Sequence, residues 1–225
     1  MNIKVDYFDN EIKLSNDLVY SIEIENKKYF YRFVQDLYKI MNENYSDTIG
    51  FYDDSYTEIS MKDNLQIVTD FFNFSFNSKK NINDITKYVK EKFNEDDIQK
   101  IILQYKKIKA TYENVLNDID LPLKLSQDIN IDDITKLMKI TVNFCNNLLD
   151  NILLLIDIEK NFTPNGILVF INLKSYLAPE DLIELYKYSI YNQIKIILVD
   201  SVSYGVTLKN ERKLIIDDSL VEFML

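Results

Sequence analysis

The sequence predicts an α/β protein in which a discontinuous sheet domain carries an inserted α-helical domain. Two apolar runs, 166–172 and 194–200, flank a helical stretch, a pattern typical of a strand–helix–strand unit in a buried parallel sheet. Short apolar bursts near the start predict further strands, whereas the middle of the chain shows long helical periods. The sheet domain is therefore expected at 1–60 and 161–225, and the helical domain at 61–160.

The first sixty residues predict short strands around one helix. Apolar residues come in short bursts at 3–5, 11–14 and 18–24, and the last of these alternates with polar residues as a half-buried strand does. From Lys27 to Met41 apolar residues recur at helical spacing, which predicts a helix that crosses the sheet. Another short strand is expected at 49–52.

Two long helices are expected in the middle of the chain, where helical periods begin at Leu65. One apolar stripe runs from Asp97 to about Asp120, and Pro122 ends that helix. A second helix is expected from a cap at Asn130 to about Lys160. At about 1.5 Å per residue both are longer than a crossover helix requires, so they are expected to form an antiparallel pair.

The second long helix is apolar on more than one face. Leu153 and Leu154 lie off its main stripe, so it is expected to pack both within its own domain and against another subunit. Cys145 falls on the stripe and is expected to be a buried thiol. As the only cysteine, it cannot form an internal disulfide. After a break near Pro164, the chain returns to strand–helix–strand and closes with two short strands.

Histidine is absent from all 225 residues, and only three glycines occur. The lack of histidine excludes Ser-His-Asp and Cys-His catalytic arrangements and most zinc, copper and iron sites. The phosphate-binding pattern G-x-x-x-x-G-K-[ST] is also missing. The sheet domain is therefore expected to resemble a degenerate P-loop-type fold without a Walker A motif, and the protein is expected not to be an enzyme.

One enzyme interpretation stays open. Asp200 follows a run of apolar residues, in the form of a Walker B strand whose aspartate holds magnesium. Asp200 and Asp53 would then be magnesium ligands of a diverged nucleotide hydrolase. The alternative is that Asp200 is only a carboxylate at the end of a strand, because a few apolar residues followed by aspartate is a common pattern.

No apolar run approaches the roughly 18 residues that a membrane span requires, and the first residues are too acidic for a signal peptide. The protein is therefore expected to be cytoplasmic, with no membrane partner. Its formal net charge of −10 argues against a uniformly basic nucleic-acid binder. A local basic surface is still compatible with that total.

Five aspartates, Asp118, Asp120, Asp128, Asp132 and Asp133, lie within sixteen positions. The helix dipole favours Asp132 and Asp133 in a first helical turn without any ligand. It disfavours Asp118 and Asp120, which follow the end of a helix, and a hard divalent ion would offset that repulsion. We therefore expect calcium as a cofactor, with Asp118, Asp120, Asp128 and Asp132 as its ligands.

A basic stretch between Lys79 and Lys109 contains nine lysines against five carboxylates and no arginine. Lysines contact phosphates as point charges and suit the reading of bases poorly, so this stretch favours DNA binding without sequence preference. A solvated helix face would show the same composition. The candidate DNA-binding residues are Lys79, Lys80, Lys100, Lys106, Lys107 and Lys109.

Several blocks of the sequence, in their order and spacing, resemble the small fourth adaptation protein of type II-A CRISPR systems. The resemblance spans nearly the whole chain and is most specific at Ile67–Asn77 and Leu168–Asn172. The blocks are Tyr7–Leu14, Phe51–Asp54, Leu65–Asn77, and Leu168–Asn172 with Tyr176, Leu177 and Glu180.

This resemblance implies a ring-shaped homotetramer that threads double-stranded DNA and binds linear ends without sequence preference. It also implies calcium ions that hold the ring, and no nuclease or ATPase activity. The implied role is spacer acquisition in antiviral defence, alongside the CRISPR integrase complex and the effector nuclease. A protein-interaction scaffold of the adaptation complex is the alternative, and it would need no basic concave surface.

Overall fold

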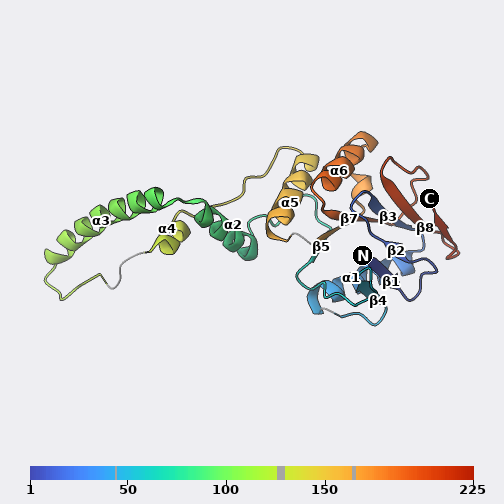
Figure 1. Cartoon of the computed structure of the whole chain (residues 1–225), viewed down its shortest axis with the longest axis horizontal. Helices are drawn as coiled ribbons and strands as arrows, with labels where there is room; N and C mark the ends of the chain where they lie inside the picture. Colours follow the sequence, from blue (N-terminus) through green and yellow to red (C-terminus); the bar gives the residue numbers. More distant parts are fainter. Residues whose placement is uncertain (44, 126–129, 164–165) are drawn as a thin grey trace. The chain divides into compact units, whose positions relative to one another are not determined.

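The chain divides into two compact units, shown in sequence colours in Figure 1. The computed structural model describes residues 1–43, 45–125, 130–163 and 166–225. The first unit consists of Met1–Phe74 and Phe144–Leu225, and the second of Ser75–Asn143. Within the described ranges, no helix is long and apolar enough to cross a membrane.

A six-stranded sheet forms the centre of the first unit, with strand order β5-β6-β7-β3-β8-β9. The first five strands in this order are parallel, and β9 is antiparallel to β8. Every residue of β3 and β6 is buried, which explains why β6 is a continuous apolar run. The strands are β3 (Val19–Ile24), β5 (Leu65–Val68), β6 (Ile167–Ile171), β7 (Lys195–Asp200), β8 (Glu211–Ile216) and β9 (Glu222–Met224).

The two faces of this sheet have different chemistry. Helix α1 (Lys27–Glu43) buries Phe33 and Leu37 in one apolar core with Ile22 of β3. A small antiparallel sheet, in the order β2-β1-β4, contributes to the same core. Its strands are β1 (Asn2–Val5), β2 (Ile12–Lys13) and β4 (Ile49–Tyr52). Because neighbouring residues of a strand point to opposite faces, Glu23 points away from this core.

The opposite face of the sheet is covered by α6 (Pro179–Tyr191) and the short 3₁₀ helix η1 (Leu173–Ser175). Helix α5 (Leu148–Phe162) packs beside α6, and Figure 1 shows the two helices side by side. The first unit is therefore a layered α/β structure, which confirms the expected α/β class. The likeness to a P-loop-type fold stays a prediction.

The second unit consists of α2 (Lys79–Lys92), α3 (Glu95–Asn117), α4 (Ile131–Leu137) and their connections. Each helix begins at a polar side chain that accepts a backbone N–H of its first turn: Ser78, Asn94 and Asn130 respectively. No residue of α2 or α3 is buried. The helices are thus defined by their caps, while their apolar faces are incompletely covered within one chain.

The second long helix expected at 130–160 does not exist as one element. Helix α4 ends at Leu137, and Lys139 has a φ of 49°, in the left-handed region that a helix cannot continue through. A new helix, α5, begins only at Leu148, where the Asn147 side chain accepts the N–H of Asp150. The expected antiparallel pair of long helices is therefore wrong.

The boundaries of the units also differ from the expected helical domain at 61–160. Residues 61–74 belong to the first unit because β5 pairs with β6, and 144–160 belong there because α5 packs on α6. Cys145 lies between α4 and α5 and is exposed, so the expected buried thiol is also wrong. Leu153 and Leu154 of α5 are half-buried.

Candidate nucleic-acid interface

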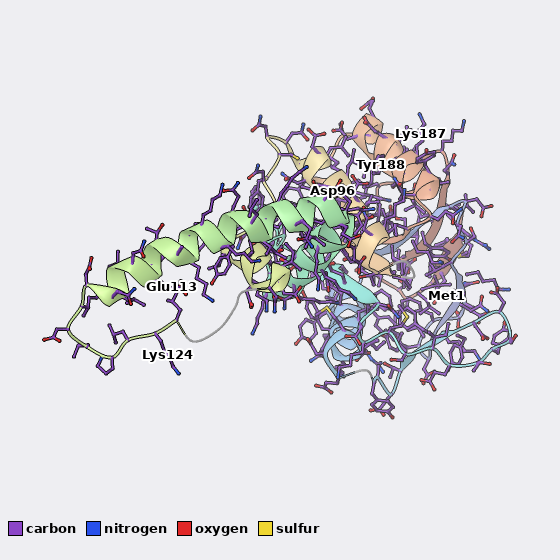
Figure 2. All side chains as sticks on the ribbon, turned by 60° about the vertical axis from the view of Figure 1, so that its left-hand side comes forward. Met1, Asp96, Glu113, Lys124, Lys187 and Tyr188 are labelled. Atoms are coloured by element: carbon purple, nitrogen blue, oxygen red, sulfur yellow. The ribbon has the colours of Figure 1, made fainter. Side chains whose placement is uncertain are left out.

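Helix α3 is the longest helix in the described part of the chain, and it is amphipathic. Successive residues of an α-helix advance by roughly 100°, so Ile101, Ile108 and Tyr112 share one face, and Lys106 and Lys107 lie on the opposite half. Figure 2 shows side chains projecting along this helix between Asp96, in its first turn, and Glu113, near its C-terminal end. The sequence thus directs one face of α3 toward apolar contacts and the other toward water.

The lysines on α3 differ in their availability. Lys100, Lys106 and Lys107 are exposed, and none of the three forms an ion pair with another described residue. Lys109 is half-buried and interacts with another part of the chain. The ammonium groups of Lys100, Lys106 and Lys107 are therefore free to bind an external anion.

Lys79 and Lys80 form a separate basic position. Both are exposed in the first turn of α2, at the end of that helix distant from its junction with α3. Over fourteen residues this places them about 20 Å along the α2 axis from the junction. The helix dipole disfavours cations in a first turn, so these lysines do not stabilise α2 itself. Of the six predicted DNA-binding lysines, four therefore lie on α3 and two at the start of α2.

The charge of the protein is divided unequally between the two units. By sequence, the second unit contains twelve lysines and eleven carboxylates, and no arginine. The first unit contains the remaining 14 basic residues and 25 carboxylates. A polyanion is therefore repelled by the first unit and tolerated by the second, where α3 carries four lysines and, past its first turn, Glu113 as its only carboxylate.

The structure does not bring the predicted calcium ligands together among the residues it describes. Asp118 is the C-terminal cap residue of α3, and Asp118 and Asp120 are both exposed. Asp132 forms an ion pair with Lys90 at 2.5 Å, and Asp128 lies outside the described residues. In the described ranges no group of three or more acidic or cysteine side chains is arranged to hold a metal ion. Calcium binding by these aspartates therefore stays a prediction.

An apolar groove of about 730 Å³ lies within the second unit, and the sequence did not predict it. It is lined by residues of all three helices, among them Ile108, Tyr112, Ile134 and Met138. Ile108, Tyr112 and Met138 are each more than half exposed. The sequence signal was the apolar stripe of α3, for which a long partner helix was expected. Helix α4, with seven residues, covers only part of that stripe.

The two aspartates of the enzyme interpretation have different surroundings. Asp53 follows β4, and its Oδ1 accepts the backbone N–H groups of Ser55 and Thr57 at 2.8 Å, so it stabilises a turn. Asp200 ends β7 and is completely buried beneath η1 and α6, among the charged side chains on that face of the sheet. Asp200 is thus not accessible to a nucleotide in this structure.

Comparison with known proteins identifies the family. The family model of the CRISPR-associated protein Cas_Csn2 matches residues 43–220. The crystal structure of Stu0660 of Streptococcus thermophilus has a similar fold, with a TM-score of 0.63 and 13% sequence identity, over 100% of this chain and 76% of that one. A search of curated proteins gives no match. Because the family model covers well over half of the sequence, the chain belongs to the Csn2 family of type II-A CRISPR-associated proteins.

Proposed function

We propose that the chain is a non-catalytic protein that binds double-stranded DNA, preferentially at linear ends, as a homotetrameric ring during CRISPR spacer acquisition. Membership of the Csn2 family implies a role in CRISPR adaptation. The proposal adds the ligand, the assembly and the absence of chemistry on the DNA. It includes calcium as a stabilising ion, and the integrase complex and effector nuclease as partners.

The observation that carries the DNA-binding proposal is the set of exposed lysines on α3 that form no ion pair with another described residue. Lys100, Lys106 and Lys107 present ammonium groups without acidic partners among the described residues, in a chain whose net charge is −10. Ammonium groups bind phosphates strongly and read base edges poorly, because they lack the bidentate geometry of a guanidinium group. This surface therefore favours binding that is independent of sequence.

The assembly proposal rests on the apolar surface of the second unit. A single chain leaves Ile108, Tyr112 and Met138 more than half exposed around one groove. Monomeric proteins rarely leave apolar surface of this kind in water, and such patches mark interaction sites. We infer that another copy of the chain covers this surface.

The proposal includes calcium, but the described aspartates cannot be its complete set of ligands. The described carboxylates of Asp118, Asp120 and Asp132 are not grouped around a common point, and Asp132 is paired with Lys90. A calcium site here would need further oxygen ligands, such as backbone carbonyls, water or side chains of a second copy. Its ligands would then be complete only in the assembled ring.

The same groove supports the second candidate function, a protein-interaction scaffold without DNA binding. An apolar groove binds an amphipathic helix of another protein as readily as a second copy of this chain. The two functions differ in their response to DNA, since a scaffold does not shift duplex DNA even at low salt.

The decisive experiment compares one plasmid in two forms, covalently closed and linearised by a single cut, in gel-shift titrations at low salt. A closed ring can be loaded only over a free end, so the linear form is expected to bind far more tightly. Equal affinity for both forms would contradict the threaded ring but not DNA binding. Failure to bind either form would favour the scaffold.

A further inference from the structure

A network of buried charges lies on the sheet face covered by η1 and α6. The ammonium of Lys174 donates hydrogen bonds to Ser21 Oγ at 2.7 Å, to Glu23 Oε1 at 2.9 Å and to Glu211 Oε1 at 2.6 Å. All three of its donors are thereby used. None of these four side chains is more than 7% exposed.

A second ammonium completes the network. Lys213, on β8, is fully buried and lies 2.8 Å from Glu23 Oε1, and it donates a hydrogen bond to the Val206 carbonyl at 2.6 Å. Burial alone would raise the pKa of Glu23, but the hydrogen bonds from Lys213 and Lys174 outweigh burial and hold that pKa below its usual value. Two carboxylates and two ammonium groups thus balance one another.

Asp200 is a third carboxylate in the same region, and no ammonium is left to balance it. It pairs with Glu23 in the parallel register of β7 and β3, and it is fully buried. Neither carboxylate oxygen has a hydrogen-bond partner of good geometry among the described residues, although the backbone amide of Lys174 favours its charged form. Ionised Asp200 would give the network one uncompensated negative charge.

The network also holds the segment 201–210, which connects β7 to β8. Glu23 Oε2 accepts hydrogen bonds from Ser203 Oγ at 3.0 Å and from the Tyr204 N–H at 3.1 Å. Glu211 Oε2 accepts one from the Leu208 N–H at 2.7 Å. The two carboxylates that neutralise the lysines therefore also fix this segment to the sheet.

We propose that the buried carboxyl of Asp200 is a proton-binding site whose ionisation loosens the segment 201–210 from the sheet. With the proton bound, the network is neutral. When the proton leaves, the new negative charge repels Glu23 and Glu211 and competes with them for Lys174 and Lys213. The hydrogen bonds that those two glutamates accept from the segment weaken as a consequence.

The groups that face Asp200 come from every element packed around it. Burial raises the pKa of Asp200 to about 7; Lys174 of η1 opposes this rise, and Glu23 of β3 and Glu211 of β8 reinforce it. Tyr186 of α6 donates a hydrogen bond to Glu211 Oε1 at 3.3 Å, and burial raises the pKa of its phenol, so it stays neutral. Lys213 of β8 forms its ion pair with Glu23 and donates a hydrogen bond to the Val206 carbonyl.

The direction of the effect on stability follows from linkage. The pKa is raised from 3.8 to about 7 in the folded protein, so the folded state binds the proton more tightly than the unfolded chain. The stabilisation is complete below about pH 4 and is lost as pH rises toward 7. Hydrogen bonds of the segment 201–210 are expected to weaken over the upper part of this range.

The first test is a carbon NMR titration of the wild-type protein labelled at aspartate carboxyl carbons. The Asp200 resonance is assigned by its loss in Asp200→Asn. A midpoint within about one unit of pH 7 is expected, and a midpoint below pH 5 overturns the proposal. The titration itself is carried out on the wild-type protein, and the variant is needed only to assign the resonance.

The second test measures amide hydrogen exchange of Tyr204 and Leu208, as protection factors at pH 6 and pH 8, for the wild type and Asp200→Asn. In the wild type the protection factors are expected to fall about tenfold from pH 6 to pH 8, which is the change in an opening equilibrium that corresponds to a shift of one pKa unit. In Asp200→Asn the protection factors are expected to stay constant. Asp63→Asn, which removes an exposed carboxylate of the same unit, should behave as the wild type. Equal pH dependence with and without Asp200 would overturn the coupling to the segment.

Discussion

Nζ of Lys174 lies 2.6 Å from Oε1 of Glu211, and both side chains are buried between the six-stranded sheet and the helices η1 and α6. The two residues come from different elements, and the same ammonium also neutralises Glu23. In the folded state this ammonium therefore bridges two buried carboxylates, and Lys213 supplies the second positive charge that balances them.

Replacing Lys174 by Met should lower the free energy of unfolding by about 3–5 kcal/mol, because Glu23 and Glu211 then lose a buried partner. Urea denaturation followed by circular dichroism measures the change. Lys187→Met is the matched control, since Lys187 is exposed on α6, and its effect should stay within about 0.5 kcal/mol. Similar losses for the two variants would show that Lys174 has no special role in stability.

A charge placed in the apolar groove of the second unit should disrupt the assembly. Met138 is 67% exposed in the single chain, so Met138→Glu should leave the monomer folded while the buried carboxylate opposes contact with another copy. Light scattering coupled to size-exclusion chromatography is expected to show a tetramer for the wild type and smaller species for this variant.

Lys139→Glu provides the control for that substitution, because residue 139 is exposed next to the groove without lining it. It should retain the assembly of the wild type. A wild-type protein that stays monomeric at micromolar concentration with calcium would refute the ring, whatever the variants do.

Calcium should raise the melting temperature, and a chelator should lower it, because an ion that binds only the folded state stabilises that state by mass action. Asp118→Asn or Asp120→Asn is expected to reduce this response, whereas Asp63→Asn should preserve it. Asp132→Asn distinguishes the role of Asp132 as the ion-pair partner of Lys90 from its predicted role as a calcium ligand. If Asp132 only pairs with Lys90, the substitution lowers the free energy of unfolding by at most about 1 kcal/mol and leaves the calcium response intact. Identical melting curves in calcium and in chelator would remove the ion from the proposal.

The sequence predicted the strands best where a strand is buried on both faces. β6 and β7 appear as continuous apolar runs because helices cover both sides of the sheet. Such a run is sufficient to locate the strand in the sequence. β5 was missed because it is a four-residue edge strand, too short to interrupt the helical periods expected from Leu65. The break after Leu137 was missed because it depends on a left-handed Lys139, and lysine gives no signal for that conformation.

The buried charges could not be predicted from the sequence, because their partners are distant in the chain. Lys174 and Glu23 are separated by 151 positions, and an alternating strand such as β3 normally directs a glutamate to water. Only the fold shows that α6 and η1 cover this face and that two lysines reach it. The lysines of α3 were predicted because a basic run on one helix is a local property of the sequence. The apolar groove beside them was not predicted, because it exists only since α4 is too short to cover the apolar stripe of α3.

Reversing the charge of Lys106 or Lys107 should weaken duplex binding about equally for unrelated DNA sequences. Each phosphate contact that is lost removes about 0.9 from the slope of log affinity against log salt, so the slope should become shallower by about 1 for each lysine that contacts a phosphate. Fluorescence anisotropy with two unrelated linear duplexes, between about 50 and 200 mM salt, measures both quantities. Lys187→Glu, an exposed reversal on the acidic first unit, makes the same change in net charge and should leave the slope unaltered. Equal losses in Lys106→Glu and Lys187→Glu would indicate an effect of total charge alone, while discrimination of more than about 1–3 kcal/mol per base pair would reject recognition through the phosphate backbone.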